Sequence, residues 1–470
     1  MKNFRQFILN EAKLGLGDPK EHLTHIEDLV IEEGPAGMVK LKQTVNGIIN
    51  FARGLEQGDD PNAKAEINLK VDGAPALYFG EDPRPGFKKQ FFVATKHNLQ
   101  RKEQFLNHTH EEIEENHPKE QQAGLVVKLS EALDKLKPFY DAIKSSIGSR
   151  IVQTDMLFGN SSEKKTETID GVQYLTFHPQ LIKYAIPVDP EDTLYNTAAK
   201  AEFGIGIHDT WKASIEDVPD AKTGEKFGHV FLRDSNKKYI QKIVTAAEGK
   251  FSNHNILAIN SNFSEESTGI NLNDTAADEI LQLIDLAEQE LNTVSTAMNQ
   301  QLYGDNRHEF ITRVTVYING EVRKHANKDT NNFYTQAYRG TPFNSKYLRQ
   351  SFMDFLHSQL ERDMKGKGER GQMNAREKFK LREDLFDVYQ PYFKCMYYLI
   401  QMKRKLEELF DQINSTLKIG KSFYAQDDGS YEYDPQGEGF AIFVGKDNHT
   451  KLVKRLEFSG RNLIKPKFGK

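Results

Sequence analysis

The segment Lys70-Val71-Asp72-Gly73 places a primary amine, a carboxylate and a glycine just before the apolar run "PALYFG" at residues 75–80. In a strand, Lys70 and Asp72 point to the same side because successive side chains alternate. A lysine amine attacks phosphorus only when unprotonated, so burial and neighbouring cations must lower its pKa from the free value of about 10.4. Asp-Gly is also a favoured turn pair, so the same residues are compatible with a plain β-turn.

Three later segments carry charged residues beside strand-like apolar runs. They contain Asp155 in "TDMLFG", Glu438 before "GFAIF", and Lys451 with Lys454 in "KLVKR". Each segment alone is also compatible with an ordinary loop or a solvated strand. Their order along the chain, their position beside strands and their chemistry make the set more informative than its members.

Together with Lys70, these segments resemble the covalent nucleotidyltransferase superfamily of ATP-dependent DNA ligases, RNA ligases and mRNA capping enzymes. The resemblance implies ATP and Mg²⁺ as cofactors and a lysyl-AMP intermediate on Lys70, with a layout closer to an RNA ligase than to a capping enzyme. Where the superfamily commonly has arginine two residues after the motif glycine, this chain has Pro75. The other residues implied to contact the nucleotide or the metal are Asp72, Gly73, Asp155 (ribose), Phe203 (adenine, with Phe177 as the competing aromatic), Lys451 and Lys454 (phosphate), and Glu438 (magnesium).

A second resemblance covers the first eleven residues, "MKNFRQFILNE", in which Phe4, Phe7 and Ile8 fall on one face of a short helix. This peptide resembles the capsid-targeting sequence of internal head proteins from large tailed bacteriophages. The prohead protease cuts those proteins after a Leu-x-Glu or Ile-x-Glu triplet. The resemblance implies cleavage after Glu11, packaging in the phage head with the protease and scaffold as partners, and release into the host cytoplasm. The residues alone also allow an amphipathic helix that docks on its own domain.

The composition limits the classes of protein that the chain can belong to. Its 470 residues allow two or three domains, and the single cysteine, Cys395, excludes an internal disulfide framework and a cysteine-based zinc site. We find no apolar run long enough to span a bilayer, so we expect no membrane partner. The net charge of −5 argues against a protein coated in nucleic acid, although residues 451–470 contain seven Lys or Arg and one acid.

The elements that must position these residues follow from periodicity. We expect helix over 20–57 with a break at Gly34-Pro35, short strands within 66–95, helix over 119–147, and strands at 150–159, 172–187 and 203–213. Residues 235–415 are strongly helical, with a charged, glycine-rich loop at 363–378, and strands return near 438–458. We expect those last strands to join the sheet of the first domain.

The predicted fold is therefore α+β, with an antiparallel, β-rich nucleotidyltransferase core of the ATP-grasp or ligase-like kind and a large helical insertion. The predicted parts are a targeting peptide at 1–19, a core at 20–215 and 430–470, and a helical insertion at 216–429. We interpret His108 with His110, and Gly204 with Gly206, as structural rather than as metal or dinucleotide sites.

The predicted function is ATP-dependent joining of nucleic-acid ends, RNA or DNA, by a ligase-like nucleotidyltransferase packaged in the phage head. One alternative is a non-catalytic internal capsid protein that binds nucleic acid or a host factor. Another is a nucleotidyltransferase that transfers AMP to a host protein.

Overall fold

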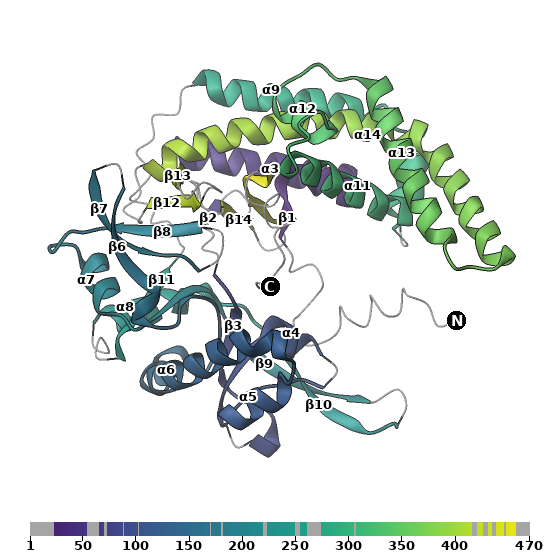
Figure 1. Cartoon of the computed structure of the whole chain (residues 1–470). Helices are drawn as coiled ribbons and strands as arrows, with labels where there is room; N and C mark the ends of the chain where they lie inside the picture. The colour runs from purple at the N-terminus through teal and green to yellow at the C-terminus, as the bar shows by residue number, and fades with distance from the viewer. Residues whose placement is uncertain are drawn as a thin grey trace. The chain divides into compact units, whose positions relative to one another are not determined.

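The computed structural model describes residues 23–53, 65–69, 73–87, 89–101, 103–169, 171–179, 182–219, 223–249, 254–260, 274–304, 307–415, 421–425, 431–434, 439–445 and 448–456. The chain divides into two compact units, each built from separate stretches of sequence (Figure 1). Unit 1 includes residues 69–262 and 418–437. Unit 2 includes residues 23–68, 263–417 and 438–470.

Unit 1 contains a mainly antiparallel sheet in the order β10-β9-β5-β3-β4, and β11 runs parallel beside β9. The strands of this sheet are β3 (Ala76–Glu81), β4 (Phe91–Thr95), β5 (Ile151–Phe158), β9 (Phe203–Pro219), β10 (Lys226–Arg233) and β11 (Ile256–Asn260).

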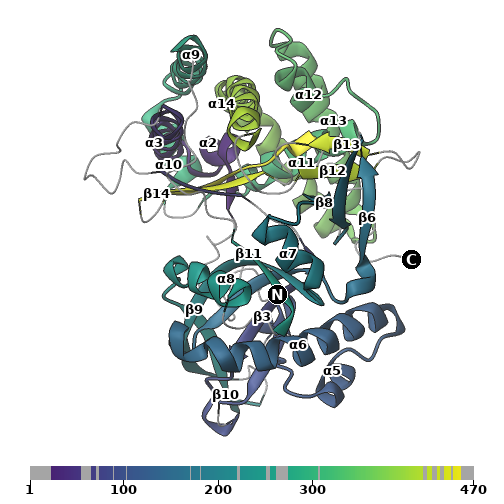
Figure 2. The same cartoon turned by 90° about the vertical axis from the view of Figure 1, so that its left-hand side faces the viewer.

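Alternation of side chains gives this sheet two buried faces. Residues such as Phe79, Val152 and Ile205 pack on one face against α6 (Ala123–Ile147) and α8 (Ile240–Glu248), which lie beside the sheet in Figure 2. Tyr78 and Trp211 belong to a smaller apolar cluster on the opposite face. Asp155 alternates with the core residue Met156 along β5 and therefore lies on this second face.

A second sheet in unit 1 has the order β13-β12-β8-β7-β6, and every neighbouring pair is antiparallel. The helix α7 (Thr193–Lys200) contacts β7 and β8. Two strands of this sheet, β12 and β13, come from a late part of the chain. Ser422 on β12, for example, pairs with Tyr184 on β8. The strands are β6 (Lys164–Ile169), β7 (Val172–Phe177), β8 (Ile182–Pro187), β12 (Lys421–Ala425) and β13 (Tyr431–Asp434).

A buried polar cluster links the hairpin between β3 and β4 to α5 (His110–Asn116) through hydrogen bonds. The Asp82 carboxylate accepts hydrogen bonds from the Arg84 side chain at 2.6 Å and lies 3.0 Å from the His108 ring. The same ring lies 2.9 Å from the Glu112 carboxylate and stacks on Phe87 at 4.9 Å. These contacts account for the position of His108 in the fold.

Unit 2 combines helices with a four-stranded sheet in the order β1-β15-β14-β2. Gly34, at φ 62°, ends α2, and Pro35 begins α3, which is the break expected from the sequence. The strands are β1 (Thr24–His25), β2 (Ala65–Leu69), β14 (Phe440–Val444) and β15 (Asn448–Leu452). The helices are α2 (Leu29–Glu33), α3 (Pro35–Ala52), α9 (Asp274–Leu291), α10 (Thr296–Tyr303), α11 (Glu309–Ala326), α12 (Phe333–Tyr338), α13 (Ser345–Met364) and α14 (Glu369–Ser415).

A network of buried charges joins the two ends of unit 2 to α14. Arg455 donates to Glu27 at 3.2 Å and to Asp28 at 2.8 Å, while Lys403 on α14 donates to Glu27 at 3.0 Å. The hydroxyl of Tyr334 also donates to Glu27, at 2.6 Å. Burial alone would raise the pKa of Glu27, but the charges of Lys403 and Arg455 lower it to about 2. This carboxylate is therefore ionised inside the fold.

The structure confirms the mixed α+β class and most of the expected elements, and it corrects four of them. The expected helical insertion at 216–429 begins instead with the strands β10 and β11, which pair with β9 in unit 1. Residues 172–187 form two strands rather than one, because the chain turns between β7 and β8. The expected loop at 363–378 is only four residues long, since α14 already begins at Glu369. The strands at 440–452 pair with β1 and β2 and not with the β3–β5 sheet. Residues 23–68 and 438–470 accordingly group with the helices of unit 2, a division different from the expected one. The expected targeting peptide lies outside the described residues.

Candidate functional site

Among the predicted site residues, Asp155 is the one whose surroundings in unit 1 the structure describes most fully. It lies near the end of β5, where the backbone of Asp155 pairs with Ala76 on β3 and Gly206 on β9. Its Oδ2 atom accepts a hydrogen bond from the backbone N–H of Gly73 at 3.3 Å and lies 3.1 Å from Nε2 of His208. The residue is 8% exposed, so the carboxylate is largely shielded from water.

Gly73 joins the Lys70–Gly73 motif to Asp155 because its backbone lies directly against β5. A Cβ atom at this position would come within 2.3 Å of the carbonyl oxygen of Met156, which explains why glycine is needed here. The next residues continue the contact: Ala74 donates its N–H to Met156 at 2.9 Å, and Pro75 accepts from the N–H of Met156 at 3.1 Å. Pro75 therefore contributes its backbone carbonyl to the contact between this segment and β5.

A β-bulge in β9 places His208 beside Asp155. Thr154 pairs with Ile207 and Gln153 pairs with Asp209, so His208 is the extra residue on the bulged strand. The imidazole is 24% exposed and contacts the carboxylate, which fixes the orientation of both groups. Sequence reasoning missed His208. The available signal was the pattern Gly204-x-Gly206-x-His208, in which two residues without side chains precede the histidine on one strand face.

A lysine from α6 supports the same segment from the other side. The Nζ atom of Lys128 donates to the carbonyl oxygen of Ala74 at 2.8 Å. Gly73 to Pro75 are therefore held both by β5 and by α6. The geometry offers a carboxylate with a preset orientation and a neighbouring imidazole, which together suit binding of a hydroxyl group such as a ribose hydroxyl.

The two aromatic candidates for adenine stacking are core residues of unit 1. Phe203 is fully buried in the cluster between the sheet, α6 and α8. Phe177 is 2% exposed and its ring contacts Phe158 at 5.3 Å and Tyr184 at 5.6 Å. Both rings thus have a packing role that accounts for their position.

The remaining predicted site residues divide into two groups. Lys70, Asp72 and Glu438 lie outside the described residues. Lys451 and Lys454 belong to unit 2, at and just after the end of β15. Lys451 pairs through its backbone with Ala441 and His25, and Lys454 lies 3.5 Å from the Asp411 carboxylate. The buried Arg455 follows immediately and anchors this segment to Glu27 and Asp28.

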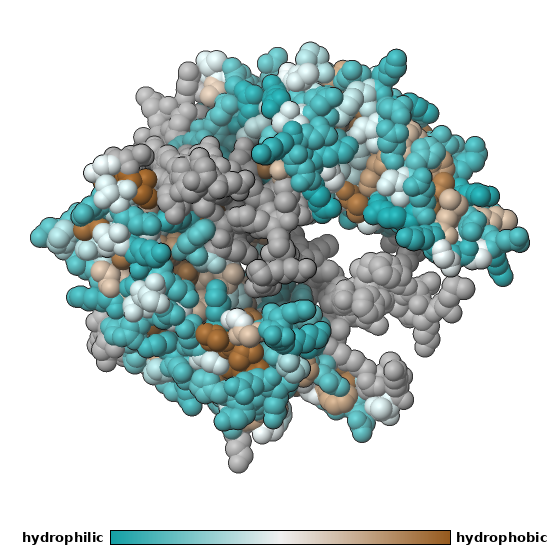
Figure 3. Space-filling view, in the orientation of Figure 1, coloured by the Kyte–Doolittle hydropathy of each residue, from teal (hydrophilic) through white to brown (hydrophobic). Residues whose placement is uncertain are grey.

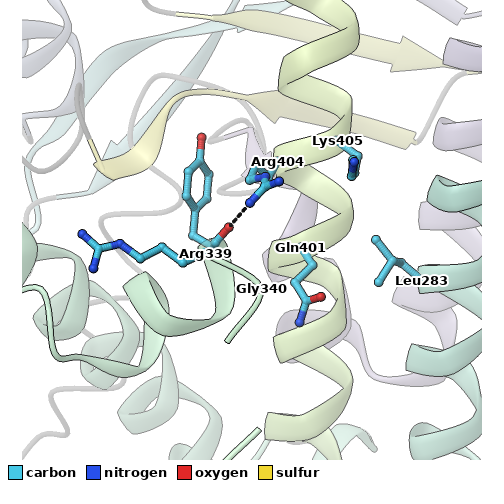
Figure 4. A pocket seen from close by; sticks show the side chains of 7 residues that line it. Leu283, Arg339, Gly340, Gln401, Arg404 and Lys405 are labelled. Carbon is cyan, nitrogen blue, oxygen red and sulfur yellow. Dashed lines mark hydrogen bonds between the residues drawn. The ribbon is translucent and has the colours of Figure 1, made fainter. Parts of the chain in front are cut away.

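Unit 2 also contains a small hollow that is lined by none of the predicted site residues (Figure 4). It has a volume of about 140 Å³ and lies between α9, the end of α12 and α14. Arg404 donates to the carbonyl oxygen of Tyr338 at 3.3 Å and pairs with Glu408, and Lys405 pairs with Glu279. Two of the three cations that line the hollow, Arg404 and Lys405, are thus paired with acids, and these pairs account for their positions.

No group of three or more His, Cys, Asp or Glu within the described part of the chain is arranged to hold a metal ion. Among the same residues, no helix is long and apolar enough to cross a membrane.

The fold and the Asp155 site define a two-unit α+β protein with an oriented carboxylate–imidazole pair on its mainly antiparallel sheet. Residues 20–467 match the Family of unknown function (DUF6267), and the chain belongs to this family. No curated protein and no solved structure matches the chain.

Proposed function

We propose that the protein is an ATP-dependent, ligase-like nucleotidyltransferase that joins nucleic-acid ends through a lysyl-AMP intermediate on Lys70. The observation that carries the proposal is the hydrogen bond between Gly73 and Asp155, at 3.3 Å. It connects the last residue of the Lys-x-Asp-Gly motif to the acidic strand residue, two features that are 82 positions apart in the sequence.

The reaction has three displacements at phosphorus. Unprotonated Lys70 attacks the α-phosphorus of ATP, a P–N bond forms, and the bond to the pyrophosphate oxygen breaks. An oxygen of a nucleic-acid 5′-phosphate then attacks the same phosphorus, and the electron pair of the P–N bond returns to the lysine nitrogen. Finally, a 3′-hydroxyl attacks the activated 5′-phosphate and releases AMP as the phosphodiester forms.

The other residues supply orientation and charge. Asp155 accepts a hydrogen bond from a ribose hydroxyl, and His208 keeps the carboxylate in position. The reaction also needs cations beside the transferred phosphate, whose charge favours the unprotonated form of Lys70. Asp72 completes the motif around Lys70. A Mg²⁺ ion would supply charge that stabilises the leaving pyrophosphate. Phe203 and Phe177 are packed in the core of unit 1, so neither ring is assigned to adenine in this proposal.

The adduct assay tests this function directly. Incubation with α-labelled ATP and Mg²⁺ should give a labelled protein band that Lys70→Ala abolishes. Lys119→Ala is the matched control, because Lys119 is an exposed lysine of the same unit. Failure to form an adduct with any nucleotide would end the proposal.

The acceptor is identified by comparing substrates for the labelled enzyme. Transfer to nicked RNA or nicked DNA supports end joining. Label that leaves Lys70 only when a host lysate is added supports transfer of AMP to a protein instead. A chain that binds nucleic acid equally well with Lys70→Ala, and never forms an adduct, fits the non-catalytic internal head protein.

We propose in addition that the protein is packaged in a phage head and is cut after Glu11. The support is the resemblance of the first eleven residues to a capsid-targeting peptide. Mass spectrometry of purified virions should find Ala12 as the mature N-terminus. An intact Met1 in virions would contradict the cleavage.

A further inference from the structure

An exposed cluster of cations lies where α13 and α14 meet. We name it the basic tip and define it as Lys365, Lys367, Arg370, Arg376, Lys378 and Lys380. All six residues are exposed. Residues 365–380 contain these six cations and only two acids, Glu369 and Glu377, so their net charge is +4 in a chain whose net charge is −5. The basic tip is therefore strongly positive, whereas the whole protein has a net negative charge.

The basic tip differs from the rest of the helix pair in having unpaired charges. Elsewhere on these helices cations meet acids: Arg382 pairs with Glu309, Arg349 with Asp387, Lys394 with Glu290 and Lys405 with Glu279. Within the described part of the chain, none of the six cations of the basic tip forms an ion pair. Like charges four residues apart on a helix, such as Arg376 and Lys380, destabilise it slightly. The fold thus gains nothing from this concentration of charge.

The shape of the turn leaves the basic tip open to a partner. In Figure 1 the joined end of α13 and α14 extends past the other labelled helices of unit 2, and its outermost edge is mainly hydrophilic in Figure 3. Gly366 and Gly368 lie in the turn, and a Cβ atom on either would have no heavy atom within 4 Å. A large partner can therefore approach the backbone as well as the cationic side chains.

The side chains of the basic tip indicate which kind of polyanion it would bind. A helix that inserts into an anionic membrane surface carries a continuous apolar face, whereas Met373 is the one large apolar side chain in 365–380 that is exposed, at 55%. A nucleic-acid backbone needs only closely spaced cations, because its charge is carried by regularly spaced phosphates. We propose that the basic tip binds the phosphate backbone of a nucleic acid, without reading its sequence. The inference rests on charge, exposure and pairing and is independent of the chemistry proposed for Lys70.

The test compares two triple variants of the full chain that remove the same charge. The first is Lys365→Gln, Lys367→Gln and Arg370→Gln in the basic tip. The control is Lys328→Gln, Arg339→Gln and Lys346→Gln, which neutralises three exposed cations elsewhere in unit 2. The probes are a nicked DNA duplex and a single-stranded RNA, and the affinity for each is measured by fluorescence anisotropy over a range of salt concentrations. Co-sedimentation with anionic lipid vesicles is measured in parallel.

We expect the basic-tip variant to bind the duplex about tenfold or more weakly at low salt. The slope of log affinity against log salt should decrease by about 2 to 3, since each lost phosphate contact contributes about 0.9. The control triple should keep the affinity and slope of the unmodified protein. Equal losses in both triples, no binding of nucleic acid by the unmodified protein, or binding only to anionic lipid vesicles would overturn the proposal. Adduct formation on Lys70, measured on the same variants, should be unchanged, which separates failure of this inference from failure of the proposed reaction.

Discussion

At the scale of single residues, Asp155 is held by groups from three parts of the chain. Gly73 donates its N–H to the carboxylate, His208 contacts the same oxygen, and Ala76 pairs with Asp155 through the backbone. Such an oriented carboxylate can contact a substrate without first losing conformational freedom. If Asp155 contacts the substrate, as proposed, its replacement should therefore lower activity.

Asp155→Asn should slow formation of the lysyl-AMP adduct about tenfold or more, because hydrogen bonds to charged groups are worth roughly 1.5–3 kcal/mol. The amide has the same shape but presents a donor to one of the two groups that now face a carboxylate. Asp134→Asn is the control, since Asp134 forms an exposed surface pair with His110. An adduct rate equal to that of the unmodified protein would remove Asp155 from the proposed site.

Gly73→Ala should destabilise the protein by about 1–3 kcal/mol, the usual range for overpacking. The new methyl group would meet the backbone of Met156, which cannot move without breaking the pairing of β3 with β5. Gly86→Ala is the control, because a Cβ atom there has no heavy atom within 4 Å. Urea unfolding of the two variants measures the difference, and equal midpoints would show that the segment yields easily.

The sequence offers Asp155 as a candidate, whereas the contact between His208 and Asp155 depends on tertiary structure. Asp155 follows an apolar strand pattern and lies beside a motif that chemistry singles out. His208 reaches Asp155 only because β9 is bulged between Ile207 and Asp209, and a bulge has no reliable sequence pattern. The same limit applies to Phe203, whose aromatic character is visible in the sequence although its burial is not.

At the scale of elements, the buried charges of unit 2 fix how helices and chain segments meet. Glu27 lies 376 positions from Lys403 and 428 positions from Arg455, yet all three are buried together. Charged residues are rarely fully buried, so the sequence favours an exposed position for each. This contact could not be predicted, because no local pattern relates residues so far apart.

Lys403→Met should destabilise unit 2 by about 3–5 kcal/mol, since it leaves a buried carboxylate without one of its cations. Lys405→Met, two residues further along α14, should cost about 1 kcal/mol or less, because its pair with Glu279 is exposed to solvent. Thermal or urea unfolding of the two variants makes the comparison. Equal effects would mean that the network contributes no more than a surface pair.

The cluster around Asp82 predicts a dependence of stability on pH. Burial would raise the pKa of Asp82, but hydrogen bonds from His108 and Arg84 lower it below the ordinary value of 3.8. A carboxylate whose pKa is lower in the folded state stabilises the fold above the unfolded pKa. That stabilisation is lost as the pH falls from 3.8 through the folded pKa.

Asp82→Asn should therefore lower the free energy of unfolding by about 2 kcal/mol at neutral pH, and the difference should shrink below pH 4. Urea unfolding from pH 7 to pH 3 tests this, with Asp134→Asn as the surface control. A difference that stays constant over this range would show that the ionisation of Asp82 does not contribute.

At the scale of the whole molecule, local patterns predicted the class of fold but not the grouping of its parts. The break at Gly34-Pro35 and the helices of 274–415 follow from the spacing of apolar residues, which is local information. The membership of unit 2 depends instead on Thr24 pairing with Thr450. Since strand pairing between distant segments is decided by tertiary packing, the sequence alone did not distinguish it from pairing with the β3–β5 sheet.

The pairing of early with late strands has a consequence for how the chain is made. Both units are completed by residues 421–456: β12 pairs with β8 in unit 1, and β15 pairs with β1 in unit 2. A ribosome that adds 5–20 residues per second delivers Thr450 roughly 20 to 90 s after Thr24. Until Lys403 and Arg455 have been synthesised, the Glu27 carboxylate lacks both of these cations. The final assembly of both units is thus a late event of translation, because each unit needs a strand from the last 50 residues of the chain.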